Sequence, residues 1–534
     1  VVNIITKEPS NPYWFSYNTF YDMPKQFSNS LNIGFNINKF SYSLNGTHNN
    51  TKGYDLTKDD TDSEGTFEIN KTQEEYSSIS LDHVVKYILN KTTFFKASYK
   101  SYSKKFKKIK YITGNTYLQS ELPHFDEKMM SVSYNKEFSN ESSIRLLYQA
   151  ENYIKSYYFP YYNTSLPSLT NLDPKINGEI FPWSSPRINN TSILYNWSYK
   201  KHSVLTGLEY TNQSYKSINI LSNDGSILKK SIFDINETKN MNDISFFSLD
   251  SYKLSKSHEI DLGFRINYNS KYNIKISPSF SVKSLIKNYI YRLNYSQSFR
   301  APSLKELYYN FGDHPGGFPI IGNNELKPST SNYYSLSIES LKRRNNSLEI
   351  YYNNVSNMIA NKFEYMSSSD TTTVYRYNNY KNIILYGLHL NILFIPFDKT
   401  EFKSTYSFTN AKSKYQDVLD GISMHSINLE LKYKLSKSIR LILSTKYNSN
   451  KTVDTSLENE NNQRTEIVLP GYHMLNISFM KNFNSGNYIK FGVKNLLDYI
   501  DSNPEYPDFL SSYDPGRRFY ININFNLSKG MLNK

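Results

Sequence analysis

The chain has 534 residues, of which 16% are aromatic, with no cysteine and a formal net charge of +14. The lack of cysteine excludes a disulfide scaffold, a zinc–thiolate site and a thiol nucleophile. The basic charge first suggests a nucleic-acid partner, but the lysines and arginines are scattered and many fall beside expected turns, as at Lys200 and Arg343. We therefore predict no nucleic-acid partner.

The apolar residues are dispersed along the chain and do not form long runs. Mean hydropathy is −0.61, and no apolar run reaches the roughly 18 residues that a membrane-spanning helix needs. The longest candidate, residues 383–397, is interrupted by His389 and Asn391. A membrane β-barrel escapes this test because half of its wall residues face inward. The 49 Tyr and 32 Phe fit such a wall, since tyrosine has an apolar ring and a polar tip that suit a membrane interface.

Alternation of apolar and polar residues is the main secondary-structure signal, and it is clearest at residues 516–527, GRRFYININFNL. In a strand successive side chains point to opposite faces, so this segment has one apolar face and one face of amides and a phenol. The apolar face consists of Phe519, Ile521, Ile523, Phe525 and Leu527. Because the pattern recurs along the whole chain, it predicts a sheet with lipid outside and water or protein inside.

In chain order, the alternating segments define about 22 strands, an even number within the range of outer-membrane barrels. The predicted strands are residues 13–21, 31–38, 40–44, 76–89, 92–102, 128–138, 143–154, 191–199, 203–212, 243–254, 259–268, 274–286, 289–299, 332–341, 348–359, 383–395, 401–408, 426–435, 439–447, 472–483, 488–496 and 516–527.

The connections between these segments alternate between about ten tight turns and about eleven mostly long loops, as in barrels with short periplasmic turns and long extracellular loops. We therefore predict an all-β protein, an antiparallel transmembrane β-barrel of about 22 strands with both termini periplasmic. A propeller would show a blade repeat, which the sequence lacks. A barrel of this width carries a plugged lumen, yet residues 11–534 are all wall and loop.

Several motifs resemble those of TonB-dependent outer-membrane receptors. Residues 295–308, YSQSFRAPSLKELY, followed by GNNELKPS at residues 322–329, are similar to a strand–loop–strand signature of this family. The VKNLLD segment (493–498), with PGRRFYININF (515–525), resembles the C-terminal signature. The first seven residues, VVNIITK, resemble the last strand of the family's plug domain, and NIILYGLHL, from Asn382, is a weaker match to a wall strand. A polar tail after Phe525 departs from the terminal aromatic residue usual in the family.

The resemblance implies a domain organisation and a function. Residues 1–10 are expected to be a remnant of the plug and residues 11–534 the barrel, in the outer membrane of a Gram-negative bacterium. The implied function is energy-coupled import of a scarce large solute: an iron–siderophore, haem or cobalamin. The implied partners are the inner-membrane protein TonB, contacted through an N-terminal box that this sequence lacks, and the protein's own missing plug. Outer-membrane lipid and lipopolysaccharide are expected around the barrel, and a surface lipoprotein is a further candidate partner.

Two loops hold the candidate ligand contacts. The aromatic loop at residues 157–189 could stack on a ring-bearing ligand, although an interface girdle or packing within the loop would use the same residues. Arg187 could pair with an anionic ligand or with lipopolysaccharide. The loop at residues 311–322 places Asp313 and His314 between turn residues, but this pair lacks the further ligands that a metal site needs. The candidates are Tyr158, Tyr161, Tyr162, Trp183, Arg187, Phe311, Asp313, His314 and Phe318.

Polar residues in the predicted wall strands are expected to face the lumen. His389, Arg292 and Glu430 need polar partners there, and a plug is the natural source of such partners. No phosphate-binding loop or catalytic arrangement is visible, so we predict neither an enzyme nor a metal or other cofactor. Alternatives are a passive outer-membrane pore or surface-binding barrel without energy coupling, and a soluble β-rich enzyme or sugar-binding propeller.

Overall fold

A computed structural model describes residues 12–23, 25–54, 73–107, 110–112, 117–119, 122–138, 141–158, 180–217, 220, 238–310, 320–342, 346–365, 373–413, 422–458, 464–483, 486–500 and 514–528. Nearly all of this chain is in strands. The wall strands are β1 (Tyr13–Asp22), β2 (Gln26–Ile37), β3 (Phe40–Thr51), β4 (Glu75–Asn90), β5 (Thr93–Lys107), β8 (Leu122–Glu137), β9 (Ser143–Tyr158), β10 (Ile180–Tyr199), β11 (His202–Ser217), β12 (Thr238–Lys253), β13 (His258–Asn269), β14 (Asn273–Ile286), β15 (Tyr289–Arg300), β17 (Ser329–Ser340), β18 (Asn346–Ser356), β21 (Ile383–Phe394), β22 (Thr400–Lys412), β23 (His425–Lys434), β24 (Ile439–Asn448), β27 (Tyr472–Asn482), β28 (Tyr488–Lys494) and β29 (Arg518–Ser528).

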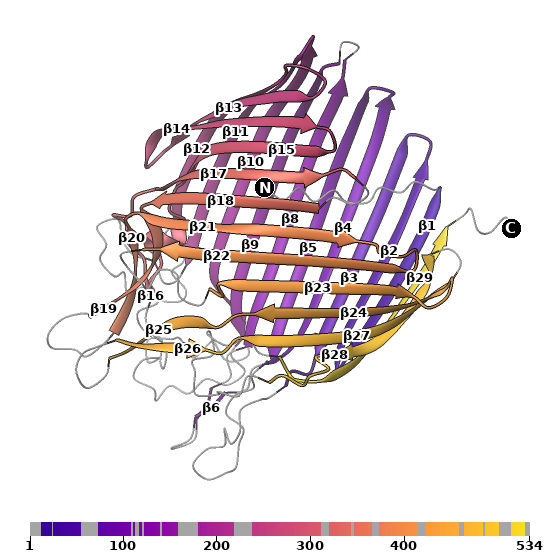
Figure 1. Ribbon diagram of the computed structural model, residues 1–534. Helices are drawn as coiled ribbons and strands as arrows, with labels where there is room; N and C mark the ends of the chain where they lie inside the picture. Colours follow the sequence, from indigo (N-terminus) through magenta and orange to yellow (C-terminus); the bar gives the residue numbers. More distant parts are fainter. Residues whose placement is uncertain are drawn as a thin grey trace.

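These strands form one 22-stranded antiparallel sheet that closes on itself (Figure 1). Each strand pairs with the next wall strand along the chain, and β1 pairs with both β2 and β29. Closure removes the sheet's edges, so every wall strand has neighbours on both sides. The predicted fold class, a 22-stranded antiparallel barrel, is confirmed.

The outer face is apolar and exposed, as the alternation predicts. In β29, Ile521, Ile523 and Phe525 are 40%, 38% and 44% exposed, while the asparagines between them are less accessible. No second sheet covers these side chains, so the wall has its apolar face outside and its polar face inside. Among the described residues no helix is long and apolar enough to cross a membrane.

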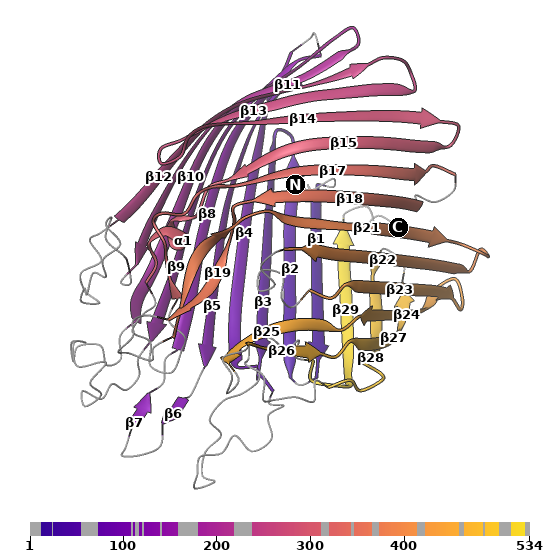
Figure 2. The same ribbon diagram turned by 60° about the vertical axis from the view of Figure 1, so that its left-hand side comes forward.

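The two ends of the barrel differ (Figures 1 and 2). At the turn end, adjacent strands are joined by tight turns, and three of these begin with Asn38, Lys200 and Lys287 at φ 53°, 53° and 54°. The loop end carries the long connections and three small sheets, formed by β6 (Lys110–Ile112) with β7 (Tyr117–Gln119), by β16 (Ile320–Ile321), β19 (Met358–Tyr365) and β20 (Thr373–Tyr380), and by β25 (Lys451–Glu458) with β26 (Arg464–Leu469). Only two loop-end connections, residues 23–25 and 270–272, are short.

Several predicted strand boundaries differ from the structure by a few residues or more, and two differences bear on the site. Strand β10 begins at Ile180, well before the predicted start at residue 191, because it pairs with β9 as far as Ile180↔Tyr158. Trp183 and Arg187 therefore lie in a paired strand and not in a loop. The connection between the predicted strands 289–299 and 332–341 also contains a short helix, α1 (Leu304–Tyr308). Above the membrane belt the outer face need not be apolar, so the alternation that marks a strand fades there while the pairing continues.

Candidate ligand-binding mouth

Residues 299–302, with the sequence FRAP, end β15 and turn inward. Together with helix α1 and Tyr309 they form a platform inside the loop end of the barrel, which we call the shelf. Ser303 begins helix α1 with a capping box, in which its backbone N–H donates to Glu306 at 2.7 Å and its hydroxyl accepts from the Glu306 N–H at 3.2 Å. The Arg300 guanidinium donates to the same carboxylate at 2.5 Å. Capping fixes where the helix starts, so the motif sets the direction in which the chain leaves the wall.

The shelf contains the main buried apolar residues of the described chain. Leu304 packs with Tyr215, Met241 and Tyr309, and Leu307 packs in an adjacent cluster. Leu307 is 0% exposed. Burial raises the pKa of Tyr309 to about 12. A barrel wall alone buries few side chains completely, so this core is what holds the chain after β15 against β11 and β12.

Hydrogen bonds tie the NELKP segment to the other side of the shelf. Asn379 accepts from the Lys327 N–H at 2.7 Å and donates to the Lys327 carbonyl at 2.8 Å. Asn323 donates to the Tyr377 carbonyl at 3.0 Å, and Tyr272 donates to the Leu326 carbonyl at 3.0 Å. The two halves of the FRAP–NELKP signature thus act as one structural unit that joins β13, β15 and the β19–β20 hairpin.

An aromatic cavity of about 530 Å³ is lined by Glu74, just before β4, and by residues of β5, β8 and β9 at the loop end. Phe95 and Tyr99 of β5 are exposed on the outer face, so Lys104 and Phe106, at the opposite parity, face the lumen. The Lys104 ammonium lies 4.0 Å from the centre of the Tyr76 ring and 4.3 Å from that of Phe106. A cation held between aromatic rings can meet an anionic ligand that also stacks.

Further rings extend this cavity along the inner wall. The ring of Phe125 lies edge-on to Phe106 at 6.0 Å and stacks on Tyr153 at 6.2 Å. Tyr157 contacts Trp183 edge-on at 5.1 Å, and Trp183 lies beside Tyr309 of the shelf. These rings form an inner aromatic band that extends from β4 to the shelf at the loop end of the barrel. Its members are Tyr76, Phe106, Phe125, Tyr153, Tyr157 and Trp183.

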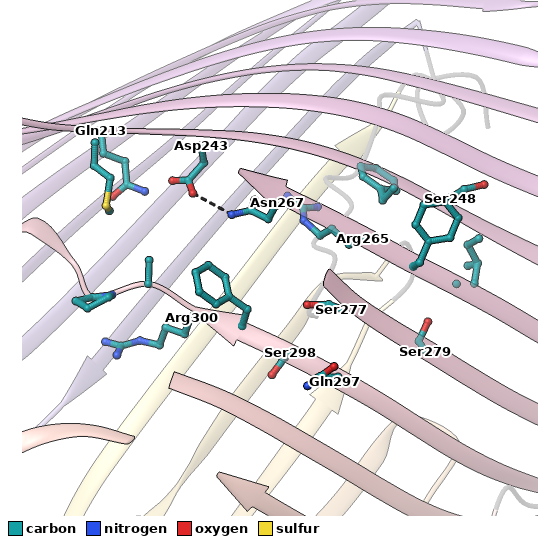
Figure 3. Close-up of a pocket in the computed structure, with 18 of the residues that line it drawn as sticks. Gln213, Asp243, Ser248, Arg265, Asn267, Ser277, Ser279, Gln297, Ser298 and Arg300 are labelled. Carbon is teal, nitrogen blue, oxygen red and sulfur yellow. Dashed lines mark hydrogen bonds between the residues drawn. The ribbon is translucent and has the colours of Figure 1, made fainter. Parts of the chain in front are cut away.

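A second, polar cavity of about 630 Å³ lies on the inner wall of β11 to β15 (Figure 3). Asn267 donates to Asp243 at 3.1 Å, and Ser277 and Ser298 lie on neighbouring strands. Arg265 donates to Glu209 at 2.7 Å. Because the two lining arginines, Arg265 and Arg300, each contact a carboxylate, this cavity offers hydrogen bonds more than free charge.

The C-terminal signature forms a compact hydrogen-bonded cluster at the loop end of the β1–β29 pair. We call this cluster, made of Asn495, Tyr499, Asp514 and Arg518, the knot. Asn495, 1% exposed and at φ 49°, donates to the Tyr499 carbonyl at 2.7 Å and to Asp514 at 2.9 Å. Asp514 also accepts from Arg518 at 2.6 Å. Arg518 and Lys494 in turn contact the buried carboxylate of Asp22, at 3.2 Å and 2.6 Å. The signature therefore links β28 and β29 to β1.

The candidate lumenal residues have partners on the wall itself. Arg292 donates to Glu339 at 2.8 Å, and Glu430 pairs with Lys432 at 2.8 Å. His389 stacks on Tyr351 at 5.2 Å and contacts the Ser407 hydroxyl at 3.1 Å. Their strand neighbours Leu293, Ile350 and Tyr433 are exposed on the opposite, outer face.

The structure places only part of the predicted ligand set. Trp183 joins the aromatic band, and the guanidinium of Arg187 donates to Asn152 at 3.1 Å on an exposed surface. Tyr161, Tyr162, Phe311, Asp313, His314 and Phe318, the side chain of Tyr158 and residues 1–10 lie outside the described residues. Within the described ranges no three His, Asp or Glu side chains are grouped to hold a metal ion.

Sequence reasoning missed the aromatic cavity, which is lined by Lys104, Phe106, Phe125 and Tyr153, and it missed Tyr76, whose ring lies against the Lys104 ammonium. The alternation of inward-facing and outward-facing residues along β9 contains a signal for this cavity. Its inward face carries Gln149 and Glu151 and then changes to Tyr153 and Tyr157 toward the loop end. Aromatic residues on the normally polar face, near a loop, indicate a lumenal site at the mouth.

The fold and the mouth together define a receptor-type transmembrane barrel. The family model "TonB dependent receptor-like, beta-barrel" matches residues 78–496. The chain belongs to this family, and it is an outer-membrane barrel of receptors, not of enzymes.

Individual relatives are distant. The iron-regulated outer membrane virulence protein of Vibrio cholerae is 22% identical over 292 residues, which cover 52% of this chain and 43% of that protein. The siderophore receptor PirA of Acinetobacter baumannii is 16% identical with a TM-score of 0.77, over 98% of this chain and 82% of that one. The ferric enterobactin receptor PfeA of Pseudomonas aeruginosa, in a complex with enterobactin, is 15% identical with a TM-score of 0.77, over 98% and 83%.

Proposed function

We propose that this barrel is the outer-membrane receptor for a ferric siderophore, which it imports using energy supplied through TonB. The observation that carries the proposal is the lumen-facing aromatic cavity around Lys104, at the mouth of a barrel of this family. Iron(III) chelates of this kind present rings or flat chelating groups and are often anionic, so stacking and one cation suit them. The three relatives described above are named for siderophores, iron or ferric enterobactin.

Other parts of the proposal concern partners. Residues 1–10 are proposed to be the end of a plug strand, and the inward-facing Arg292, His389 and Glu430 to face that plug. TonB is a further proposed partner. Lipopolysaccharide, contacting the exposed outer face, and a surface lipoprotein are further proposed partners.

Tryptophan fluorescence offers a direct binding test. Of the three tryptophans, only Trp183 lies in the aromatic band, so a Trp14→Phe, Trp197→Phe background isolates its signal. Titration with ferric tris-catecholate chelates should quench Trp183 in a saturable way. Absence of saturable quenching by any iron chelate, together with unimpaired iron-limited growth of a deletion strain, would overturn the proposal.

Lys104→Met removes the cation and keeps the packing. We expect about tenfold weaker binding of an anionic chelate, in line with one lost charged contact. Lys86→Met is a matched control, because the Lys86 ammonium lies 4.6 Å from the Phe94 ring in the same two strands at the turn end. Equal losses in both variants would argue against the cavity. Growth on the same chelate in a strain without TonB tests energy coupling separately.

A further inference from the structure

Between β14 and β15 the pairing stops while both strands continue. Their pairing runs from the tight turn only as far as Ser279↔Ser296. Beyond it, β14 stays paired to β13 up to Asn273, and β15 stays paired to β17 up to Arg300. All these residues are described, and we call the V-shaped opening between residues 273–278 and 297–300 the wedge.

Side-chain exposure supports an open wedge. On the outer face of β14, Phe280 beside the last pair is 37% exposed, whereas Ile276 and Ile274 above it are 60% and 61% exposed. This increase in the exposed fraction of the β14 side chains is expected where the neighbouring strand β15 lies farther away. Pro278 stands at the vertex, and proline has no N–H to donate to a ladder.

Cavities lie on both faces of the wall at the vertex. The polar cavity on the inner face is lined by residues on both sides of the wedge, among them Ser277 and Ser298 (Figure 3). On the outer face a hollow of about 450 Å³ is lined mainly by apolar side chains, among them Phe264, Pro278 and Phe280. Ser248 and Asp250 also line it, and the Asp250 carboxylate contacts His202 at 2.8 Å. Both cavities border Ser279, so the wedge joins a hydrogen-bonding chamber to an apolar, lipid-facing hollow.

We infer that the wedge binds the acyl chain of an amphiphilic ligand whose polar head occupies the inner cavity. An acyl chain suits the outer hollow because it needs no hydrogen bonds and gains from burial. A head of neutral hydrogen-bonding groups, such as a ferric hydroxamate, suits the inner cavity because Arg265 and Arg300 are already held by Glu209 and Glu306. The inference rests on the proposed function and narrows its ligand to an acylated iron chelate with a neutral head, which uses the polar cavity in place of the cation at Lys104.

The test uses the receptor in nanodiscs and ferric tris(alkylhydroxamate) probes with chains of increasing length. Affinity should rise with each added methylene, by up to about fourfold where the methylene is fully buried. Leu262→Trp enlarges a side chain of β13 that lines the outer hollow and not the inner cavity, and it should flatten this dependence while short-chain probes still bind. Ala97→Phe, on the outer face of β5 far from the wedge, is the matched control and should leave the dependence intact. Gln213→Ala, in the inner cavity, should weaken all chain lengths equally.

The outcomes separate the two proposals. Short-chain binding without any dependence on chain length overturns the wedge inference and leaves the receptor function standing. No binding of any iron chelate overturns the receptor function. If native mass spectrometry finds a membrane lipid retained by the wild type and lost in Leu262→Trp, with no dependence on probe length, the hollow serves membrane lipid and the inference is wrong.

Discussion

Two seams of the barrel show opposite solutions to joining neighbouring strands. The closing seam joins β1 to β29, the two ends of the wall sequence, and is paired from Trp14↔Ser528 to Asp22↔Tyr520. The β14–β15 seam joins strands that follow each other through the turn at Lys287, yet its pairing stops partway. The strands that are farthest apart in the sequence are therefore paired over nearly their whole length, whereas two strands that are consecutive in the sequence are paired only in part.

The difference follows from what each seam must supply. A tight turn holds β14 beside β15 covalently, so the far ends can separate without opening the barrel. No covalent link holds β1 to β29, and closing a loop of this length costs conformational entropy that pairing must offset. The closing seam accordingly ends in a clamp, in which the buried Asp22 carboxylate meets Lys494 and Arg518. Breaking the clamp and closing the wedge test this comparison.

The largest effect is expected from Asp22→Asn, which breaks the clamp. Asp22 is 2% exposed, and removing one partner of a buried ion pair costs about 3–5 kcal/mol. The midpoint of urea unfolding, followed by gel mobility, should fall accordingly. Glu259→Gln is the control, because its pair with Lys283, at 3.5 Å and well exposed, is worth about 0–1 kcal/mol. An unchanged midpoint in Asp22→Asn would show that strand pairing alone closes the barrel.

Leu307→Ala should release the shelf that draws the end of β15 inward. Leu307 is fully buried, and deleting such a side chain costs about 2–5 kcal/mol. We expect faster hydrogen exchange in residues 301–310 with the β1–β29 amides unchanged. Leu293→Ala, on the exposed outer face of β15, is the control. Uniformly faster exchange around the barrel would contradict a local role for the shelf.

Asn495→Ala should weaken the knot behind the clamp. The change removes the amide bonds to Tyr499 and Asp514, and each buried group left without a partner costs about 1–3 kcal/mol. Asn495→Gly, which tolerates the positive φ, separates lost bonds from backbone strain. If the glycine variant matches wild type in unfolding midpoint, the amide bonds carry no stability.

The smallest effect is expected from Pro278→Thr, which restores an N–H at the vertex of the wedge. One added ladder bond should stabilise the barrel by about 1 kcal/mol and slow hydrogen exchange at residues 297–300. Ser284→Thr, in the paired part of β14, should do neither. Unaltered exchange in Pro278→Thr would mean that the shelf, and not the proline, keeps the wedge open.

Most of this wall could be predicted from the sequence because the two faces of each strand meet different solvents. The alternation identified β14 and β15 and the turn between them, and the family motifs marked the shelf and the knot. Alternation records only which face a side chain takes. It contains no information on whether a backbone edge is bonded, so the wedge was invisible.

The site was harder to predict because its residues come from strands distant in sequence. Asp22 follows the predicted first strand as one more polar residue, and its partners Lys494 and Arg518 reach it only when the barrel closes. Trp183 was assigned to a loop because the apolar face of β10 ends before its pairing does. Lys104 could not be recognised as a site residue because the Tyr76 ring that it contacts lies on the neighbouring strand β4.

The two short connections at the loop end, residues 23–25 and 270–272, divide the barrel's rim. In the ring of 22 strands they lie about halfway round from each other. Three residues span about 10 Å at most, while a barrel of this many strands is roughly 40 Å across. Neither connection can arch over the opening, so any cover must come from the two arcs between them. The long connections of the rim therefore fall into two arcs, separated on opposing sides by these two short connections.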